Sequence, residues 1–194
     1  MFRTRVRPND GPRSKRVLAA NLEGSLLDII QDRIDLAPSL SLEFEHGTLE
    51  FGPENWNDFY HGGLWILLGL VDGREVPVPY RDRLPVLGPG ERYFSLTFHE
   101  PGPNRLVVYL HVTPSGVRFY QQYGDPRETS GNVLSGPPLG TCSERELVRT
   151  IEAEISSYLD CLVACAPNIV EHDDYPWVRD LLARARAATS QGSR

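Results

Sequence analysis

Hydrophobic and polar positions along the chain follow two periods, and each period predicts a different kind of element. Apolar residues recur every three or four positions over 15–35, which predicts a helix that ends before Pro38. The same spacing returns over 144–163, and a shorter stripe follows in the C-terminal segment, made by Trp177, Leu181, Leu182 and Ala185. The pattern therefore predicts one N-terminal helix and two C-terminal helices.

Between these helices, alternation with a period of two and short apolar runs predict strands. The predicted strands are 40–45, 49–51, 64–71, 75–80, 92–99, 106–112 and 117–123. Asp72-Gly73 stands between two apolar runs and predicts a hairpin turn. Strands that are segregated from helices favour an α+β fold, with an antiparallel meander of about five to seven strands. We expect the helices to pack on one face of this sheet and to leave the other face free.

The ends of the chain carry no such pattern. Residues 1–14 are rich in arginine and have no apolar period, so we expect a disordered tail there. A single α+β domain is expected over 15–189, followed by a frayed tail over 190–194. Two long loops, 52–63 and 124–141, are rich in glycine, proline and polar residues.

The charge of the chain is distributed unevenly. The whole chain of 194 residues has a net charge of −6, and residues 1–16 carry +5, so the remainder carries −11. An acidic body disfavours the binding of nucleic acid, and the basic tail lacks the apolar face that a membrane-binding segment needs. The charge instead predicts a basic protein partner that is steered by the field of the acidic body.

Weaker signals in the sequence bear on the cellular compartment and on whether the protein binds a cofactor. Three cysteines, an odd number, do not suit a secreted disulfide framework, and polar residues stand where a signal peptide would be apolar. The longest apolar run, 64–71, is too short to span a bilayer. We therefore expect a cytoplasmic protein. No phosphate-binding loop, dinucleotide fingerprint or nucleophile elbow occurs in the sequence, so we expect no cofactor.

Residues suited to contact a partner are concentrated in the first long loop. Aromatic side chains mixed with acidic ones are typical of protein-binding hot spots. The predicted contact residues are Trp56, Asp58, Tyr60, His61, Tyr120, Asp125 and Glu128. An alternative for Trp56 is that it plugs the core beneath the loop.

An enzyme is the alternative to a binding protein. His99 and His111 would approach each other across the hairpin of 92–112 and, with Glu100, form an acid/base pair or a ligand set on the open sheet face. A metal site is a further alternative, in which Cys161, Cys165 and His172 are joined by Cys142. The simpler interpretation of the cysteines is that they are small buried residues.

The middle of the chain resembles a known class of proteins in its layout. The meander Tyr93-Phe94-Ser95-Leu96-Thr97-Phe98, Leu106-Val107-Val108-Tyr109-Leu110 and Val117-Arg118-Phe119-Tyr120 is followed by a helix from Glu144 to Asp160. This arrangement, over about residues 90–166, resembles the immunity proteins of bacterial polymorphic toxin systems. The resemblance implies tight binding that occludes the active site of a toxin. It carries over no residue roles, because no position-specific motif matches.

These observations favour a non-enzymatic protein-binding module with an acidic surface. A small enzyme or metal-dependent hydrolase that uses His99 and His111 is the first alternative. A structural subunit of a larger assembly is the second.

Overall fold

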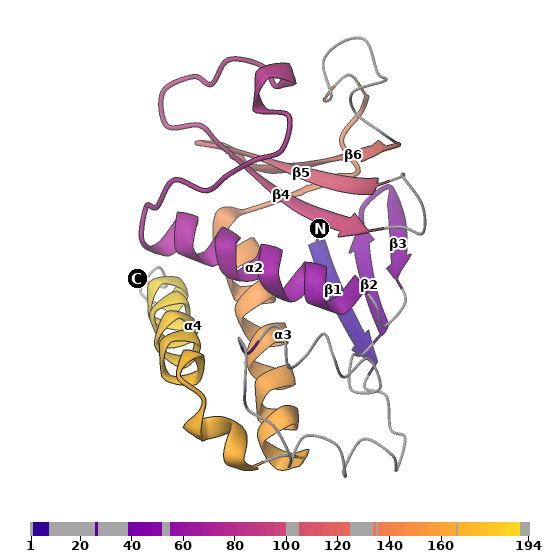
Figure 1. Ribbon diagram of the computed structural model, residues 1–194. Helices are drawn as coiled ribbons and strands as arrows, with labels where there is room; N and C mark the ends of the chain where they lie inside the picture. The colour runs from indigo at the N-terminus through magenta and orange to yellow at the C-terminus, as the bar shows by residue number, and fades with distance from the viewer. Residues whose placement is uncertain are drawn as a thin grey trace.

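The computed structural model describes residues 2–7, 26, 39–51, 55–99, 105–124, 134, 136–165 and 167–190. Within these residues, seven strands form two antiparallel sheets, and three long helices pack beside them (Figure 1). The first sheet consists of β1 (Phe2–Arg7), β2 (Ser39–Phe44) and β3 (Gly47–Phe51), in that order. The second consists of β4 (Arg92–His99), β5 (Arg105–Thr113), β6 (Gly116–Tyr123) and β7 (Gly140–Cys142), also in sequence order.

The predicted α+β class with antiparallel strands is confirmed. The predicted meander is present as β4, β5 and β6, in which Phe94 lies opposite Leu110 and Leu110 opposite Phe119. The strands divide between two sheets, however, where one was expected. The helix predicted over 15–35 lies outside the described residues except for Leu26, which is helical and buried.

The disordered tail expected over residues 1–14 is wrong for its first part, because Phe2–Arg7 forms β1. Phe2–Arg7 pairs with β2, and the buried ring of Phe2 stacks on Phe119 of the second sheet with the ring centroids 4.8 Å apart. The next residue, Arg3, is exposed. Phe-Arg-Thr-Arg-Val-Arg alternates with a period of two, and charged side chains on an edge strand discourage pairing with another chain. An arginine-rich segment is therefore compatible with a strand.

Helix α2 (Trp56–Val71) replaces residues 56–63 of the loop predicted over 52–63 and the whole strand predicted over 64–71. A short apolar run does not distinguish a buried strand from a buried helix by its period. Leu64, Ile66, Leu67 and Leu68 are all buried, so the helix is covered on several sides. Residues 72–80 after it contain no strand, and the predicted hairpin is therefore wrong.

Glycines in α2 mark places of close packing, and this explains why a sequence with a Gly-Gly pair is helical. A Cβ atom on Gly62 would lie 2.8 Å from Leu96 Cδ2, and a Cβ atom on Gly63 would lie 3.0 Å from Ile151 Cγ2. Gly62 thus lets α2 approach the second sheet, and Gly63 lets it approach the next helix. Glycine costs helix propensity at these positions, and the packing compensates for that cost.

The two C-terminal helices are confirmed as α3 (Glu144–Cys165) and α4 (Asp174–Ser190), joined by the short helix η6 (Pro167–Glu171). Ser143 Oγ accepts a hydrogen bond of 3.0 Å from the backbone N–H of Glu146 and so caps the start of α3. α3 packs against β1, α2 and α4.

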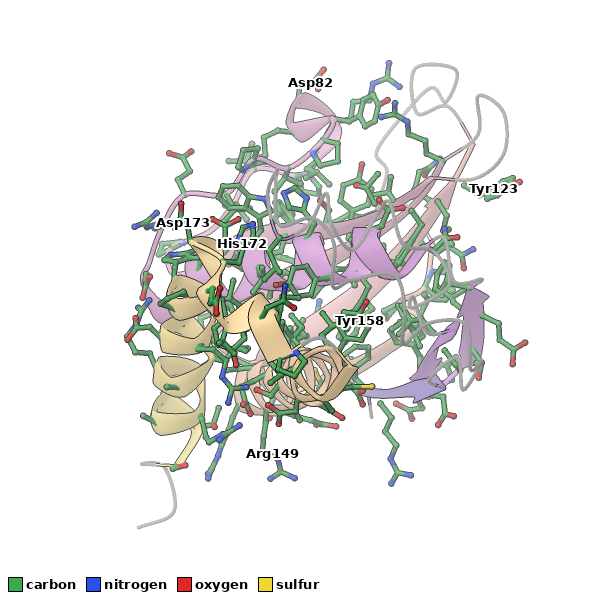
Figure 2. All side chains as sticks on the ribbon, turned by 60° about the horizontal axis from the view of Figure 1, so that its bottom comes forward. Asp82, Tyr123, Arg149, Tyr158, His172 and Asp173 are labelled. Atoms are coloured by element: carbon green, nitrogen blue, oxygen red, sulfur yellow. The ribbon has the colours of Figure 1, made fainter. Side chains whose placement is uncertain are left out.

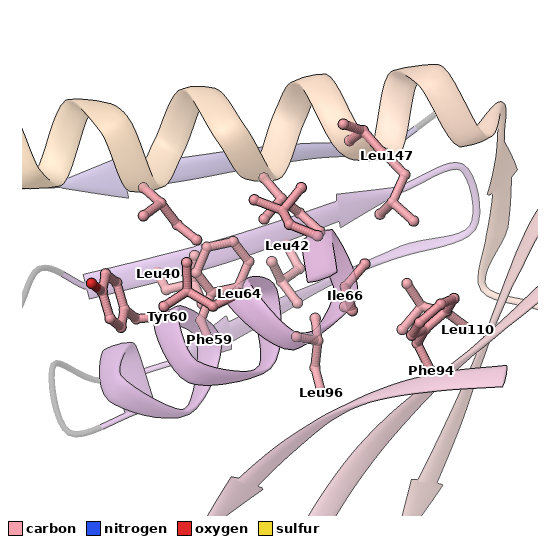
Figure 3. Close-up of a cluster of buried hydrophobic side chains, with 14 of the residues drawn as sticks. Leu40, Leu42, Phe59, Tyr60, Leu64, Ile66, Phe94, Leu96, Leu110 and Leu147 are labelled. Atoms are coloured by element: carbon pink, nitrogen blue, oxygen red, sulfur yellow. The ribbon is translucent and has the colours of Figure 1, made fainter. Parts of the chain in front are cut away.

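One large hydrophobic core joins the two sheets and the helices (Figure 3). The first sheet contributes Leu40 and Leu42, and α3 contributes Leu147. Phe59 and Ile66 come from α2, which lies between the sheets and α3. α2 is therefore the central element of the core.

The face of the second sheet that points away from the main core is partly covered. The prediction that one sheet face is free is therefore wrong for this sheet. Residues 72–91, which include the short helix η5 (Arg81–Arg83), cross this face (Figure 1). Together they bury a second, smaller hydrophobic cluster that comprises Leu84, Tyr93, Val107 and Tyr109. The hydroxyl of Tyr109 donates a hydrogen bond of 3.2 Å to the carbonyl of Pro79 and so ties this segment to the sheet.

Candidate functional site

The predicted contact residues of the first long loop lie instead on the first turns of α2. Trp56 is the first residue of the helix, Asp58 is half-buried and His61 is exposed. Tyr60 is buried, with 2% of its surface exposed, so its prediction as a contact residue is wrong. Burial, with a smaller contribution from the charge of Asp174, raises the pKa of Tyr60, and its phenol stays protonated in the core.

His61 forms a local pair with Trp65, a residue that sequence reasoning had placed in a strand. The indole Nε1 of Trp65 donates a hydrogen bond of 2.9 Å to Nε2 of His61, one turn earlier on α2. The two rings meet edge to face at 6.0 Å between centroids. Trp65 is 36% exposed, but its polar atom is already satisfied within the helix.

The remaining predicted contact residues are not assembled with His61. Tyr120 on β6 is half-buried and packs on the second hydrophobic cluster. Its neighbour Phe119 points into the main core, where α2 lies, so Tyr120 occupies the opposite face of the sheet. Asp125 and Glu128 lie outside the described residues.

The proposed acid/base pair of His99 and His111 is wrong. In the register of β4 and β5, His99 lies opposite Arg105 and His111 opposite Tyr93. Arg105 and His111 are six residues apart on one strand, so the two histidines are separated by roughly 20 Å. Glu100, the third member, lies outside the described residues.

His111 instead pairs with a glutamate that precedes β4. Its Nε2 lies 3.2 Å from Glu91 Oε2, and the same oxygen accepts a hydrogen bond of 2.9 Å from the backbone N–H of Gly88. The hydrogen bond from Gly88, followed by that from His111, lowers the pKa of the Glu91 carboxyl. This arrangement holds the turn that leads into β4.

The four predicted metal ligands are not brought together in one place, and the side chain of Cys165 lies outside the described part of the structure. Cys142 is buried in β7, whereas Cys161 is exposed on α3, seventeen residues beyond the start of the helix and roughly 25 Å along it. Burial is the main cause that raises the pKa of Cys142 to about 12, which disfavours the thiolate that a metal requires. Cys165 is the last residue of α3. Among the described residues, no group of three or more His, Cys, Asp or Glu side chains is placed to hold a metal ion.

His172, the remaining predicted ligand, has a structural role at the start of α4. It is buried, and its Nδ1 accepts a hydrogen bond of 3.0 Å from the backbone N–H of Asp174 (Figure 2). The side chain thus satisfies one of the N–H groups that a helix leaves unpaired at its N-terminus. In turn, Asp174 Oδ2 accepts a hydrogen bond of 3.1 Å from the backbone N–H of Leu26.

These hydrogen bonds fix a surface that sequence reasoning did not identify. We call it the acidic–aromatic patch, and it comprises Val170, Glu171, Asp173 and Trp177. All four side chains are exposed, and the two apolar ones unusually so, at 44% for Val170 and 42% for Trp177. From 170 to 177 the chain carries three acidic residues and no lysine or arginine. Exposed tryptophan is enriched in protein interfaces, and acidic side chains close to it in the chain would select a basic partner.

Sequence reasoning missed Trp177 because it assigned this residue to the buried stripe of the last helix. The buried residues of α4 are Val178, Leu181, Leu182, Ala185 and Thr189. Trp177 precedes the first of them, about 100° around the helix, so only part of its ring reaches the core. The sequence does contain a signal for this. Val178, Leu181, Leu182 and Ala185 already have helical spacing, so the apolar stripe is complete without Trp177.

Within the described part of the chain, every helix is too short or too polar to span a membrane.

The acidic–aromatic patch has a rigid base, because capped α4 packs on α3 through its buried stripe. Its exposed groups, an indole ring, an aliphatic side chain and two carboxylates, are suited to contact a second molecule. We compared the chain with known proteins. No protein-family model, curated protein or solved structure matches it.

Proposed function

We propose that this protein is a non-enzymatic binding protein that recognises a basic protein partner through the acidic–aromatic patch. The observation that carries the proposal is the exposure of Trp177 at the start of the capped helix α4, together with that of Glu171 and Asp173, which precede the helix. Tryptophan supplies a large apolar surface, and a hot spot of this kind is surrounded by weaker contacts that exclude water. The acidic side chains select the charge of the partner.

The charge of the chain outside its first sixteen residues supports a basic partner. A net charge of −11 there attracts a positively charged protein over a range of about one Debye length, and so raises the rate of encounter. Complementary charge contributes to the rate of association and to the selection of the partner. Trp177, once the partner covers it, contributes to the lifetime of the complex.

An immunity-type inhibitor is the form of this function that we favour. Such a protein would cover the basic surface of a toxin, and the resemblance in layout over residues 90–166 supports that form. The exposed Cys161 and the odd number of cysteines favour a reducing compartment, and we propose that the interaction takes place in the cytoplasm.

Site-specific photo-crosslinking tests the proposal directly. Trp177→benzoylphenylalanine would place a crosslinker in the acidic–aromatic patch, and Trp65→benzoylphenylalanine would place the same group on α2 as a matched control. Each variant would be irradiated in a lysate of the source organism, and the adducts would be identified by mass spectrometry.

We expect one basic protein to crosslink from position 177 and not from position 65, and the yield to fall as salt is added. Equal yields from both positions would contradict the proposed surface. An acidic or neutral adduct that is insensitive to salt would contradict the proposed class of partner.

A further inference from the structure

A cavity of about 740 Å³ lies beside the first residues of β4, far from the acidic–aromatic patch. Its volume is within the range of about 300–1,000 Å³ that small-molecule sites occupy. The walls come from the segment after α2 and from β4, and comprise Gly73, Arg74, Glu75, Val76, Pro77, Val78, Arg81, Leu87, Arg92, Tyr93 and Phe94. The cavity thus combines apolar walls with a small number of polar groups.

The charged groups of the cavity are mostly positive, although the protein as a whole is acidic. Three arginines and one glutamate line it. Arg92 is committed to the fold, because its Nη1 donates to the carbonyl of Gly69 at 3.0 Å and its Nη2 to Glu144 Oε2 at 3.1 Å. The guanidinium of Arg81 lies 5.1 Å from the centre of the Tyr93 ring. Arg74 is exposed and forms no ion pair within the part of the chain that the structure describes.

Tyr93 forms part of the cavity wall, and its hydroxyl is enclosed in the fold. Tyr93 is 5% exposed, and its buried hydroxyl has no hydrogen-bond partner among the residues described. A buried hydroxyl without a partner is costly, and native proteins rarely leave one. Nearby Tyr109 shows the usual arrangement, since its hydroxyl donates to Pro79. Because the Tyr93 hydroxyl is closed off from solvent, the polar groups that a ligand in the cavity can reach are the side chains of Arg74 and Arg81.

We propose that this cavity binds a small organic anion. In this arrangement the anionic group lies near Arg74 and Arg81, and the apolar body contacts Val76 and Leu87. Burial is the main cause that raises the pKa of Tyr93, so the phenol stays uncharged at neutral pH and does not repel an anion.

Three probes of the same shape and different charge test this proposal. The probes are 2-naphthoate, neutral 2-naphthamide and cationic 2-naphthylmethylamine, each titrated into the full chain and followed by amide NMR shifts and calorimetry. We expect saturable binding of 2-naphthoate, with shifts centred on Gly73, Arg74 and Tyr93, and an affinity about tenfold above that of the amide. The amine should show no saturable binding.

Several results would overturn the proposal. Equal affinity for the acid and the amide would mean that the cavity selects only apolar surface. Shifts confined to the arginines of residues 1–16 would mean that 2-naphthoate binds the basic tail instead. Absence of saturable binding would remove the site altogether.

The positive charge of the cavity is tested by two matched variants. Arg74→Gln removes an exposed arginine of the lining, and Arg149→Gln removes an exposed arginine of α3. We expect Arg74→Gln to weaken 2-naphthoate binding about two- to threefold and Arg149→Gln to leave it unchanged. Equal affinities of Arg74→Gln and the unmodified protein would contradict the placement of the anionic group.

The glutamate gives a change of opposite sign. Glu75→Gln removes the single negative side chain of the lining, so 2-naphthoate should bind about two- to threefold more tightly. Weaker binding by Glu75→Gln would contradict the placement of the anionic group at this end of the cavity.

Discussion

The start of α4 lies apart from the segment 72–91, which lines the cavity beside β4 (Figure 1), and the two surfaces differ in both shape and charge. The first is an exposed surface on which Trp177 stands among acidic residues. The second is a hollow in which arginines outnumber the single glutamate. A net charge of −6 therefore describes neither region. The difference shows that local charge, and not the total, decides which chemistry each surface selects.

The two regions also leave different atoms unsatisfied. At the start of α4 the polar backbone is capped by His172, and it is the apolar ring of Trp177 that remains in contact with water. In the cavity the Tyr93 ring is covered, and it is its hydroxyl that lacks a partner. The first arrangement suits a partner that covers apolar area, whereas the second encloses a polar atom that a ligand in the cavity does not reach.

Removal of the exposed tryptophan should have the largest effect on the proposed function. Trp177→Ala should weaken binding of the crosslinked partner by about 30-fold or more, as loss of a hot spot of about 2 kcal/mol implies. Its free energy of unfolding should change by about 1 kcal/mol or less, because the ring is 42% exposed. Calorimetry and urea unfolding measure the two quantities.

Trp65→Ala is the matched control for this variant. Trp65 has similar exposure, but its indole is bonded to His61, so we expect less than about a threefold change in affinity. A larger loss from Trp65→Ala than from Trp177→Ala would move the binding surface to α2.

Charge reversal in the acidic–aromatic patch should act on the rate of association. The double variant Glu171→Lys/Asp173→Lys should slow association about tenfold at low salt and much less at high salt, with a small change in dissociation. Stopped-flow fluorescence measures both rates.

A control with the same change in net charge separates local from total charge. Glu45→Lys/Glu50→Lys reverses two exposed residues of the β2–β3 hairpin. If this variant slows association as much as the first, the effect belongs to the total charge, and the acidic–aromatic patch has no special role.

The two tyrosines near the cavity should differ in their contribution to stability. Burial is the main cause that raises the pKa of Tyr109 to about 12, and its protonated hydroxyl donates to Pro79, so Tyr109→Phe should destabilise the fold by about 1 kcal/mol. Tyr93→Phe should leave the free energy of unfolding unchanged or raise it slightly, because the lost hydroxyl has no partner. Urea unfolding compares the two, and equal losses would contradict the description of Tyr93 as unpaired.

The smallest effect concerns pH and the turn before β4. The pKa of Glu91 is lowered in the folded state below its usual value of 4.5, so its contribution to stability is present above that value and is lost as the pH falls through the lowered one. Melting temperatures from pH 6 to pH 3 should therefore fall less steeply for Glu91→Gln than for the unmodified protein. His111→Asn, which removes one of the two donors, should be intermediate. Parallel curves for all three proteins would contradict the assigned contacts.

Much of the fold could be predicted from the sequence. Where only one side of a helix or strand is buried, the spacing of its apolar residues and the turn residues at its ends indicate the same element. The β4–β5–β6 meander and α3 follow this rule. α2 does not, since it is buried on several sides and its glycines serve close packing with Leu96 and Ile151. Such a run has no polar face from which a helical period can be read.

Little of the candidate site could be predicted, because exposure depends on how elements meet. Tyr60 and Trp177 illustrate both errors: the first was predicted exposed and is buried, and the second was predicted buried and is exposed. The cavity depends on where the irregular segment 72–91 crosses the sheet, and no local pattern specifies that path.

Hydrogen–deuterium exchange of the complex with the crosslinked partner tests the central claim most directly. The account predicts slower exchange on binding over 167–182, which contains η6 and the start of α4, and unchanged exchange over 57–68 on α2. Protection confined to α2 or to the segment 72–91, with residues 167–182 unchanged, would contradict it.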